Sequence, residues 1–256
     1  MSLTNPTLVL NCGSSSIKYA LIGQDGSTRI EGLAEALGNA DARIKHKHLD
    51  GSKEEISIPG ATHQLALQKI LALIEQYHPV AVGHRVVHGG REFSSAVRID
   101  EHVLSEIKRL SILAPLHNPA NAAGVEAVLA IYPNLPQVAV FDTAFHQTMP
   151  EVAFRYAIPK SLYEEHSIRR YGFHGTSHHY VSHRASELTN KEGKHGWLVA
   201  HLGNGCSATA VYDGKSLDTS MGLTPLEGLM MGTRSGDVDP SLHIHLHRVM
   251  GLSIEE

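Results

Sequence analysis

The stretch LVLNCGSSSIKYALI (residues 8–22), followed by Asp25-Gly26, decides the fold. A similar stretch, LVAHLGNGCSATAVY (residues 198–212) followed by Asp213-Gly214, stands about 190 residues further along the chain. Each copy predicts an apolar strand, a tight turn of small residues, a second strand and an Asp-Gly hairpin turn. A repeat on this scale indicates a duplicated supersecondary unit, so we expect two related domains facing a common cleft.

The two tight turns suit the oxygens of a phosphate chain, because Gly and Ser leave backbone N–H groups uncovered and add hydroxyl donors. Either hairpin alone could be an ordinary β-hairpin, since Gly and Ser are common turn residues. The repetition favours a two-part nucleotide clamp. The chain has no G-x-x-x-x-G-K-[ST] sequence, and Gly203-Asn204-Gly205 leads into a β-rich segment, so neither a P-loop nor a Rossmann fingerprint fits.

Bulk composition is that of a globular protein. The 256 residues are 42% hydrophobic and 19% charged, with a net charge of −4, and suffice for one large or two medium domains. A mildly acidic chain without a basic run argues against a nucleic-acid partner. Because no apolar stretch approaches a membrane span and no signal peptide is evident, we expect a cytoplasmic protein with no membrane partner. Its two cysteines, Cys12 and Cys206, are expected to be reduced.

The remaining pattern predicts a mixed α/β fold, with strands first and then alternating helices and strands. Further strands are expected around residues 27–34, 43–48, 55–59, 80–83 and 138–141. Helices are expected over residues 62–77 with Thr62 as N-cap, 100–111 with Asp100 as N-cap, 119–131, 175–188 and 240–251. Leu65, Ile70 and Leu71 belong to the expected apolar stripe of the first helix.

Polar side chains recur in five short segments, where Gly and Pro flanks predict loops at strand ends. The segments are GHRVVHGG (83–90), PLHNP (115–119), FDTAFH (141–146), GFHGTSH (172–178) and GTRSGD (232–237). Active sites of α/β proteins gather at such ends. His243 and His247 have the spacing of metal ligands on a helix, but a third ligand is missing, so a solvated or packed helix is favoured over a metal site.

At this point the chain resembles the acetate kinase family. The resemblance rests on residues 10–18, 83–90, 141–150 and 225–229. It implies the actin-like ATPase fold, with duplicated ribonuclease-H-like domains over residues 1–150, on the acyl and phosphate side, and 151–256, the first part of the nucleotide-side domain. It also implies reversible in-line phosphoryl transfer from ATP to acetate, dependence on Mg²⁺ or Mn²⁺, ADP as the other nucleotide, and a homodimer of the full-length protein.

The resemblance also implies roles for individual residues. Nucleotide-binding residues are Asn11, Ser14, Ser15, Ser16 and Lys18 in the first phosphate loop and His201, Gly203, Asn204 and Gly205 in the second, with Asn11 also near the metal. Catalytic residues are Arg85, Asp142, Arg234, His174 and His117, with His174 and Arg234 stabilising the transition state. Arg85 also belongs to the substrate pocket, and Val87, Leu116, Phe173 and Pro225 are implied to line the pocket for the acetate methyl group.

The physical chemistry agrees with these roles. Acetate is ionised near pH 7 and needs no strong general base, so we expect Asp142 to organise Arg85 or a magnesium-bound water. Two guanidinium groups can hold carboxylate and phosphoryl oxygens with two-pronged geometry.

The resemblance leaves some features unmatched and some alternatives open. The family's adenosine loop, its late glutamate linked to magnesium and the segment that completes the first domain have no counterpart in the 256 residues. We therefore expect a piece of a longer protein that makes no acetyl phosphate by itself. The alternatives are a propionate or butyrate kinase, since one methylene gives only about 1–3 kcal/mol of discrimination, and a non-catalytic nucleotide-binding module of the same fold.

Overall fold

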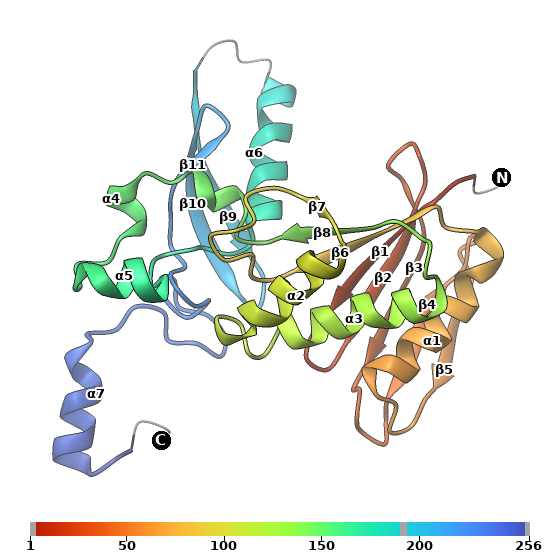
Figure 1. The fold of residues 1–256 in the computed structure, drawn as a ribbon, viewed down its shortest axis with the longest axis horizontal. Helices are drawn as coiled ribbons and strands as arrows, with labels where there is room; N and C mark the ends of the chain where they lie inside the picture. Colours follow the sequence, from red (N-terminus) through yellow and green to blue (C-terminus); the bar gives the residue numbers. More distant parts are fainter. Residues whose placement is uncertain (1–3, 190–193, 254–256) are drawn as a thin grey trace. The chain divides into compact units, whose positions relative to one another are not determined.

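The computed structural model describes residues 4–189 and 194–253, which belong to two compact units, Met1–Gln147 and Thr148–Glu256. The first unit is built on an eight-stranded mixed sheet in the order β5-β4-β3-β2-β1-β6-β8-β7 (Figure 1). Its strands are β1 (Thr7–Cys12), β2 (Ile17–Ile22), β3 (Thr28–Glu35), β4 (Arg43–Lys47), β5 (Lys53–Ser57), β6 (Ala81–Val86), β7 (Val97–Arg98) and β8 (Gln137–Phe141). The predicted mixed α/β fold is confirmed.

The predicted first hairpin is confirmed. β1 and β2 pair antiparallel, with Asn11 opposite Lys18, around the turn at residues 13–16. The Asp25-Gly26 pair turns the chain into β3, and Gly26 has a φ of 75°, which a glycine adopts without strain. β1 then pairs parallel with β6, and β6 with β8, so that the carboxyl ends of these three strands lie at one edge of the sheet.

Helices pack on the sheet of the first unit, and their N-caps follow the sequence. They are α1 (His63–Ile74), α2 (Glu101–Arg109) and α3 (Asn118–Ile131). Thr62 Oγ1 accepts the amide of Leu65, and Asp100 accepts the amide of Val103, as predicted for N-caps. The stripe predicted for α1 is wrong at Leu65, which is 42% exposed, because Ala66 and Leu67 form the buried row with Ile70, Leu71 and Ile74.

Two apolar clusters form the core of the first unit. The larger joins side chains of β1–β4, α1 and α3, and includes Leu8, Ile17, Ile44 and Leu67. The smaller joins β6, β8, α2 and α3 around Phe141, whose ring stacks on Phe93 at 4.4 Å between centroids. These clusters fix β1, β6 and β8 side by side, which is what positions the polar residues at their ends.

The second unit repeats the start of the first. Its sheet has the order β11-β10-β9, formed by β9 (Gly196–Leu202), β10 (Cys206–Tyr212) and β11 (Lys215–Thr219). The predicted Asp-Gly turn is confirmed. Asp213 and Gly214 have φ of 48° and 72°, and a positive φ at both central residues is typical of the two-residue turns that join hairpin strands. The helices are α4 (Glu151–Phe154), α5 (Lys160–His166), α6 (Gly175–Thr189) and α7 (Ser241–His245); α4 and α5 lie outside the predicted elements.

One strand differs from its prediction in a way that matters for the site. β6 continues to Val86 instead of ending at residue 83, so Arg85 lies on a strand and not in a loop. Its alternation of buried and half-buried residues shows that His84 points into the core while Arg85 lies on the other face. The sequence prediction ended this strand too early because it relied on runs of apolar residues, and His84 and Arg85 are polar.

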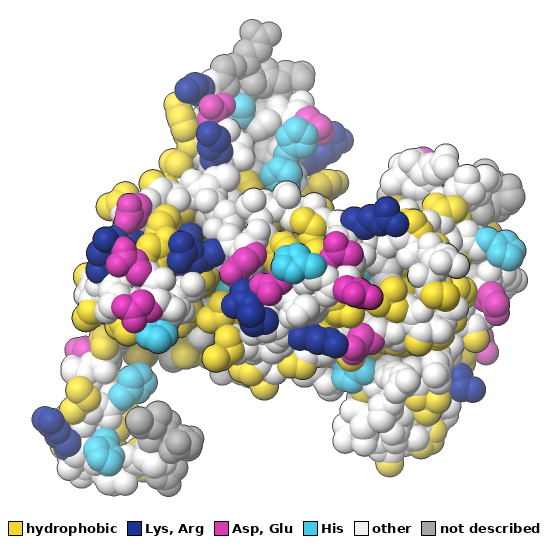
Figure 2. Space-filling view, in the orientation of Figure 1, with side chains coloured by type: hydrophobic (Ala, Val, Ile, Leu, Met, Phe, Trp, Pro, Cys, Tyr) yellow, Lys and Arg dark blue, Asp and Glu magenta, His cyan; other side chains and the backbone are white. Residues whose placement is uncertain are grey.

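The described helices include none that is long and apolar enough to cross a membrane. On the face shown in Figure 2, basic and acidic side chains are interspersed. Surface ion pairs of the first unit include Lys108 with Glu126 at 2.6 Å.

Candidate functional site

Arg85, Asp142 and Asn11 meet at the carboxyl ends of three neighbouring strands in the first unit. Arg85 Nε donates to both carboxylate oxygens of Asp142, at 3.1 and 3.0 Å, and Nη2 donates to Oδ2 at 2.5 Å. Arg85 Nη1 donates to Asn11 Oδ1 at 3.1 Å. The Asp142 side chain is 4% exposed and that of Arg85 is 39% exposed. The guanidinium is therefore held in place while part of it faces outward.

Electrostatics keeps this arginine charged. Burial lowers the pKa of Arg85, but the charge and hydrogen bonds of Asp142 outweigh it, so the pKa stands above its ordinary value. A fixed, charged guanidinium suits an anionic carboxylate or phosphoryl group.

The turn at residues 13–16 has one anchor that the sequence did not reveal. Within the turn, the Gly13 amide donates to the Ser16 carbonyl at 2.7 Å, and Ser14 and Ser15 are exposed. His63, the first residue of α1, places Nε2 2.6 Å from the Gly13 carbonyl oxygen. Because 50 residues separate these partners, spacing along the chain gave no signal of the contact.

The segment after β6 is held by amide side chains of α3. Asn121 Oδ1 accepts the amide of Val87 at 3.0 Å, and Asn121 Nδ2 donates to the Cys12 carbonyl at 2.7 Å. Asn118 Oδ1 accepts the amide of His88 at 3.1 Å. Asn121 therefore links the ends of β1 and β6, a role that sequence reasoning missed and that an Asn on the buried face of a helix could have suggested.

The other predicted residues of the first unit differ in their exposure. Val87 is 6% exposed, whereas Leu116 is 72% exposed and His117 is half-buried at the N-cap position of α3. Lys18 is exposed on β2. Cys12 is buried and Cys206 is half-buried, and burial raises the pKa of Cys12 to about 12.

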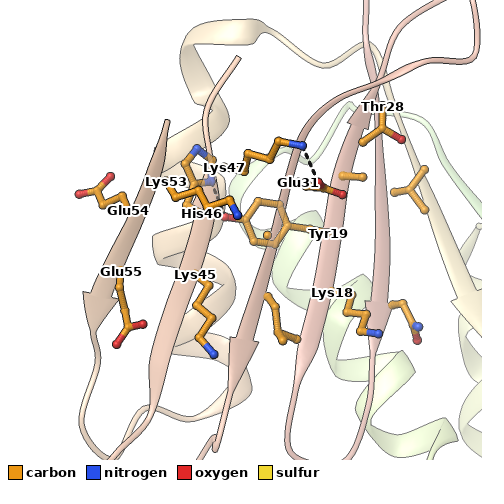
Figure 3. Close-up of a pocket in the computed structure, with 15 residues that line it drawn as sticks. Lys18, Tyr19, Thr28, Glu31, Lys45, His46, Lys47, Lys53, Glu54 and Glu55 are labelled. Atoms are coloured by element: carbon orange, nitrogen blue, oxygen red, sulfur yellow. Dashed lines mark hydrogen bonds and ion pairs between the residues drawn. The ribbon is translucent and has the colours of Figure 1, made fainter. Parts of the chain in front are cut away.

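A cavity of about 740 Å³ lies on the strands β1–β5 of the first unit (Figure 3). Of the predicted site residues it includes only Asn11 and Lys18. Lys47 and Glu31 form an ion pair at 3.0 Å in its wall (Figure 3). Arg85 and Asp142 are not among its lining residues, so Asn11 is the residue that this cavity shares with the polar cluster described above.

In the second unit three histidines and two serines form one cluster. Ser207 Oγ lies 2.9 Å from His174 Nδ1 and 2.7 Å from His178 Nε2. His201 stacks on His174 at 4.1 Å between ring centroids, and its Nδ1 lies 3.0 Å from Ser177 Oγ. His174 has a φ of 57°, in the left-handed region that few residues other than glycine adopt, directly before α6.

Arg234 and the turn between β9 and β10 lie against this histidine cluster. A Cβ atom at Gly205 would be 3.1 Å from Arg234 Nη1 and 3.5 Å from His174 Nε2. Arg234 Nη1 also donates to the Pro225 carbonyl at 3.0 Å. Gly203 and Asn204 are exposed at the tip of the turn. Within this unit the structure therefore brings together the predicted residues His174, His201, Gly205, Arg234 and Pro225, while Phe173 is buried.

The histidines of the last helical segment show no sign of a metal site. His243, His245 and His247 are exposed. Among the described residues, no group of three or more His, Cys, Asp or Glu side chains could hold a metal ion.

Comparison with known proteins gives a consistent result. The model of the acetokinase family matches residues 6–256. The chain is 56% identical over 255 residues to an acetate kinase of Pseudomonas aeruginosa, covering 97% of this chain and 64% of that relative. The chain thus spans less than two thirds of the length of the curated relatives it matches.

Solved structures agree. A propionate kinase from Francisella tularensis has a TM-score of 0.93 and 47% identity, covering 100% of this chain and 66% of that one. The acetate kinase of Porphyromonas gingivalis has a TM-score of 0.90 and 45% identity, covering 98% and 66%. These neighbours have the actin-like ATPase fold, whose mixed sheet matches that described above. The chain belongs to the acetokinase family.

Proposed function

We propose that the protein to which this chain belongs is an acetate kinase that transfers the γ-phosphoryl group of ATP to acetate, reversibly and in line. One observation carries the proposal within this family: each unit presents an arginine held by an oxygen acceptor, Arg85 by Asp142 and Arg234 by the Pro225 carbonyl. Fixed guanidinium groups supply the positioning and charge neutralisation on which phosphoryl transfer depends.

In the proposed reaction an acetate oxygen forms a bond to the γ-phosphorus. The bond from that phosphorus to the β–γ bridging oxygen breaks, and ADP leaves with its electron pair. Arg85 binds and orients the carboxylate, and Asp142 and Asn11 keep Arg85 in position. Arg234 and His174 donate to oxygens of the transferring group, where negative charge must be stabilised. His117 completes the polar set as a further donor.

The nucleotide is proposed to bind through the two small-residue turns. Asn11, Ser14–Ser16 and Lys18 contact the phosphate chain from residues 1–150, the acyl- and phosphate-side domain. His201 and Gly203–Gly205 contact it from residues 151–256, part of the nucleotide-side domain. Exposed Ser and Gly in these turns support the assignment, because they allow close approach to backbone N–H groups.

A Mg²⁺ or Mn²⁺ ion, held mainly by nucleotide phosphates and water, is proposed to lie near Asn11 at the end of β1. Asn11 Oδ1 is a hard oxygen ligand of the kind these ions prefer, although it accepts a hydrogen bond from Arg85. Asn11 would therefore hold the ion as a single protein ligand or through water. When bound, the ion neutralises phosphate charge and orients the nucleotide.

Val87, Leu116, Phe173 and Pro225 are proposed to surround the methyl group of acetate. Propionate is the second candidate substrate, because a solved propionate kinase is 47% identical to this chain and one methylene changes discrimination by only about 1–3 kcal/mol. We further propose that the full-length protein is cytoplasmic and a homodimer, and that the 256 residues alone make no acetyl phosphate.

Formation of acyl phosphate by the full-length protein tests the proposal. The product is trapped as hydroxamate with Mg-ATP and acetate, propionate or butyrate. The highest kcat/KM is expected with acetate. A higher value with propionate would favour the second candidate, and nucleotide binding without any hydroxamate would show a non-catalytic nucleotide-binding module.

A further inference from the structure

Glu227 lies at the centre of a hydrogen-bonded network that the roles proposed above leave without a purpose. The Tyr156 hydroxyl donates to Glu227 Oε2 at 2.5 Å, and Arg170 Nη2 donates to Oε1 at 2.6 Å. The Arg170 and Glu227 side chains are 22% and 31% exposed, so this ion pair is partly shielded from water. Each carboxylate oxygen has its own donor, and the Arg170 bond is charge-assisted.

The two partners of Glu227 also hold the backbone that precedes it. The Tyr156 hydroxyl accepts the amide of Leu223 at 2.8 Å. Arg170 Nη1 donates to the Thr219 carbonyl at 2.5 Å. The same two side chains therefore fasten the segment from residue 219 to residue 227 at three points.

Gly222 makes room for this arrangement. A Cβ atom at residue 222 would overlap the Glu227 carboxylate and the Tyr156 hydroxyl. The carbonyl of Gly222 accepts the amides of Tyr171 and Gly172 at 3.1 and 3.2 Å. The carboxylate thus lies directly against backbone that is itself bound to the residues before His174.

The segment continues directly into proposed site residues. Pro225 stands two positions before Glu227, and its carbonyl accepts Arg234 Nη1 at 3.0 Å. On the other side, the Gly228 amide donates to Asp237 Oδ1 at 2.7 Å, and the Asp237 amide donates to the Gly228 carbonyl at 2.8 Å. The stretch that carries Pro225 and Arg234 is therefore anchored at Glu227 and closed at Asp237.

We propose that Glu227, held by Tyr156 and Arg170, is a positioning residue that fixes Pro225 and the Arg234 guanidinium, and through Pro225 limits the length of the acyl chain. This inference rests on the proposed function for its effect on turnover. Its physical basis is that a displacement of about 1 Å in a positioning group is enough to lower the rate substantially.

Two variants displace the carboxylate by different routes. Glu227→Gln removes its charge and weakens the bond from Arg170. Gly222→Ala keeps every charge but places a methyl group in the space of the Glu227 carboxylate. This variant therefore tests the inference even if the protein with Glu227→Gln does not fold. Glu164→Gln is the matched control in the same unit, because Glu164 pairs with Lys160 and is 51% exposed.

The full-length protein and its variants are compared by amide hydrogen exchange and by hydroxamate kinetics. In both test variants we expect exchange at Leu223, Gly228 and Met231, whose amides are bonded within the network and its loop, to speed up about tenfold or more. The KM for acetate should rise about tenfold, and the propionate-to-acetate ratio of kcat/KM should rise several-fold. Glu164→Gln should leave all these quantities unchanged.

The outcomes separate this inference from the proposed function. Unchanged exchange in both test variants would overturn the positioning role whatever the activity. Faster exchange with an unchanged KM for acetate and an unchanged propionate-to-acetate ratio of kcat/KM would also overturn it. The loop would then have no effect on how Pro225 and Arg234 act on the substrate. If wild-type protein forms no acyl phosphate, the proposed function and the acyl-chain role fail together, while exchange still decides whether Glu227 fixes the loop.

Discussion

Arg85 and Asp142 form a two-pronged ion pair, with Nε and Nη2 of the arginine on the carboxylate and the shortest contact at 2.5 Å. Both groups come from the carboxyl ends of adjacent parallel strands, β6 and β8. Asp142 is almost fully buried and Arg85 is not. This asymmetry indicates that Asp142 orients the guanidinium, whose remaining N–H groups are available to an anion.

Asp142→Asn should therefore lower kcat without removing Arg85. An amide accepts a hydrogen bond but carries no charge, so the guanidinium loses its fixed orientation, and we expect kcat to fall about 10²- to 10³-fold. Steady-state hydroxamate assays on the full-length protein measure this. The control is Glu126→Gln, which removes the partner of exposed Lys108. Turnover equal to wild type in Asp142→Asn would mean that Arg85 needs no such support.

Arg85→Ala and Arg234→Ala should each lower kcat by about two to four orders of magnitude, the scale of losing an electrostatic donor in the transition state. Their Lys versions should recover little, because charge is kept while the planar fork is lost. Turnover near that of the wild type in either Ala variant would remove that arginine from the mechanism.

Val87→Ala should shift acyl preference towards longer acids. Val87 is 6% exposed, and removing its two methyl groups enlarges the space beside it. We expect a change of about 1–2 kcal/mol in relative transition-state binding of propionate and acetate. The ratio of the two kcat/KM values measures this, and an unchanged ratio would place Val87 outside the pocket.

His84 should make stability depend on pH. Burial lowers the pKa of His84 to about 4, although its bond to Gln137 at 2.6 Å opposes the shift. In the unfolded chain His84 binds a proton near pH 6.5. The stability that neutral His84 gives the folded protein is therefore fully present above pH 6.5 and is lost as pH falls towards 4. Between pH 7 and pH 5 the free energy of unfolding should drop by roughly 2 kcal/mol for this residue.

His88, fully buried and with its pKa also lowered to about 4 by burial, should add a similar drop. Denaturant unfolding at pH 7, 6 and 5 measures the total slope. His84→Gln should make the drop between pH 7 and pH 5 smaller by roughly 2 kcal/mol. A slope that is the same with and without His84 would show that its charged form is accommodated in the folded protein.

Local signals predicted the hairpins and caps, while contacts distant in sequence were out of reach. The turns at Asp25-Gly26 and Asp213-Gly214 were predictable because a positive φ, found at Gly26, Asp213 and Gly214, favours Gly and Asp. The strand position of Arg85 was missed because His84 and Arg85 interrupt the apolar pattern that marks a strand. The contact of Asn121 with Cys12 spans 109 residues, and that of Glu227 with Tyr156 spans 71, so no spacing rule reveals them.

Formation of a bond between a carboxylate oxygen of acetate and the transferred phosphorus is the central claim, and ³¹P NMR with ¹⁸O-labelled acetate tests it most directly. Full-length protein is incubated with Mg-ATP and acetate labelled in both oxygens. The account predicts ADP and acetyl phosphate whose phosphorus shows the isotope shift of one bridging ¹⁸O, because the attacking oxygen stays bonded to phosphorus. Release of unlabelled inorganic phosphate alone, or acetyl phosphate without that shift, would contradict it.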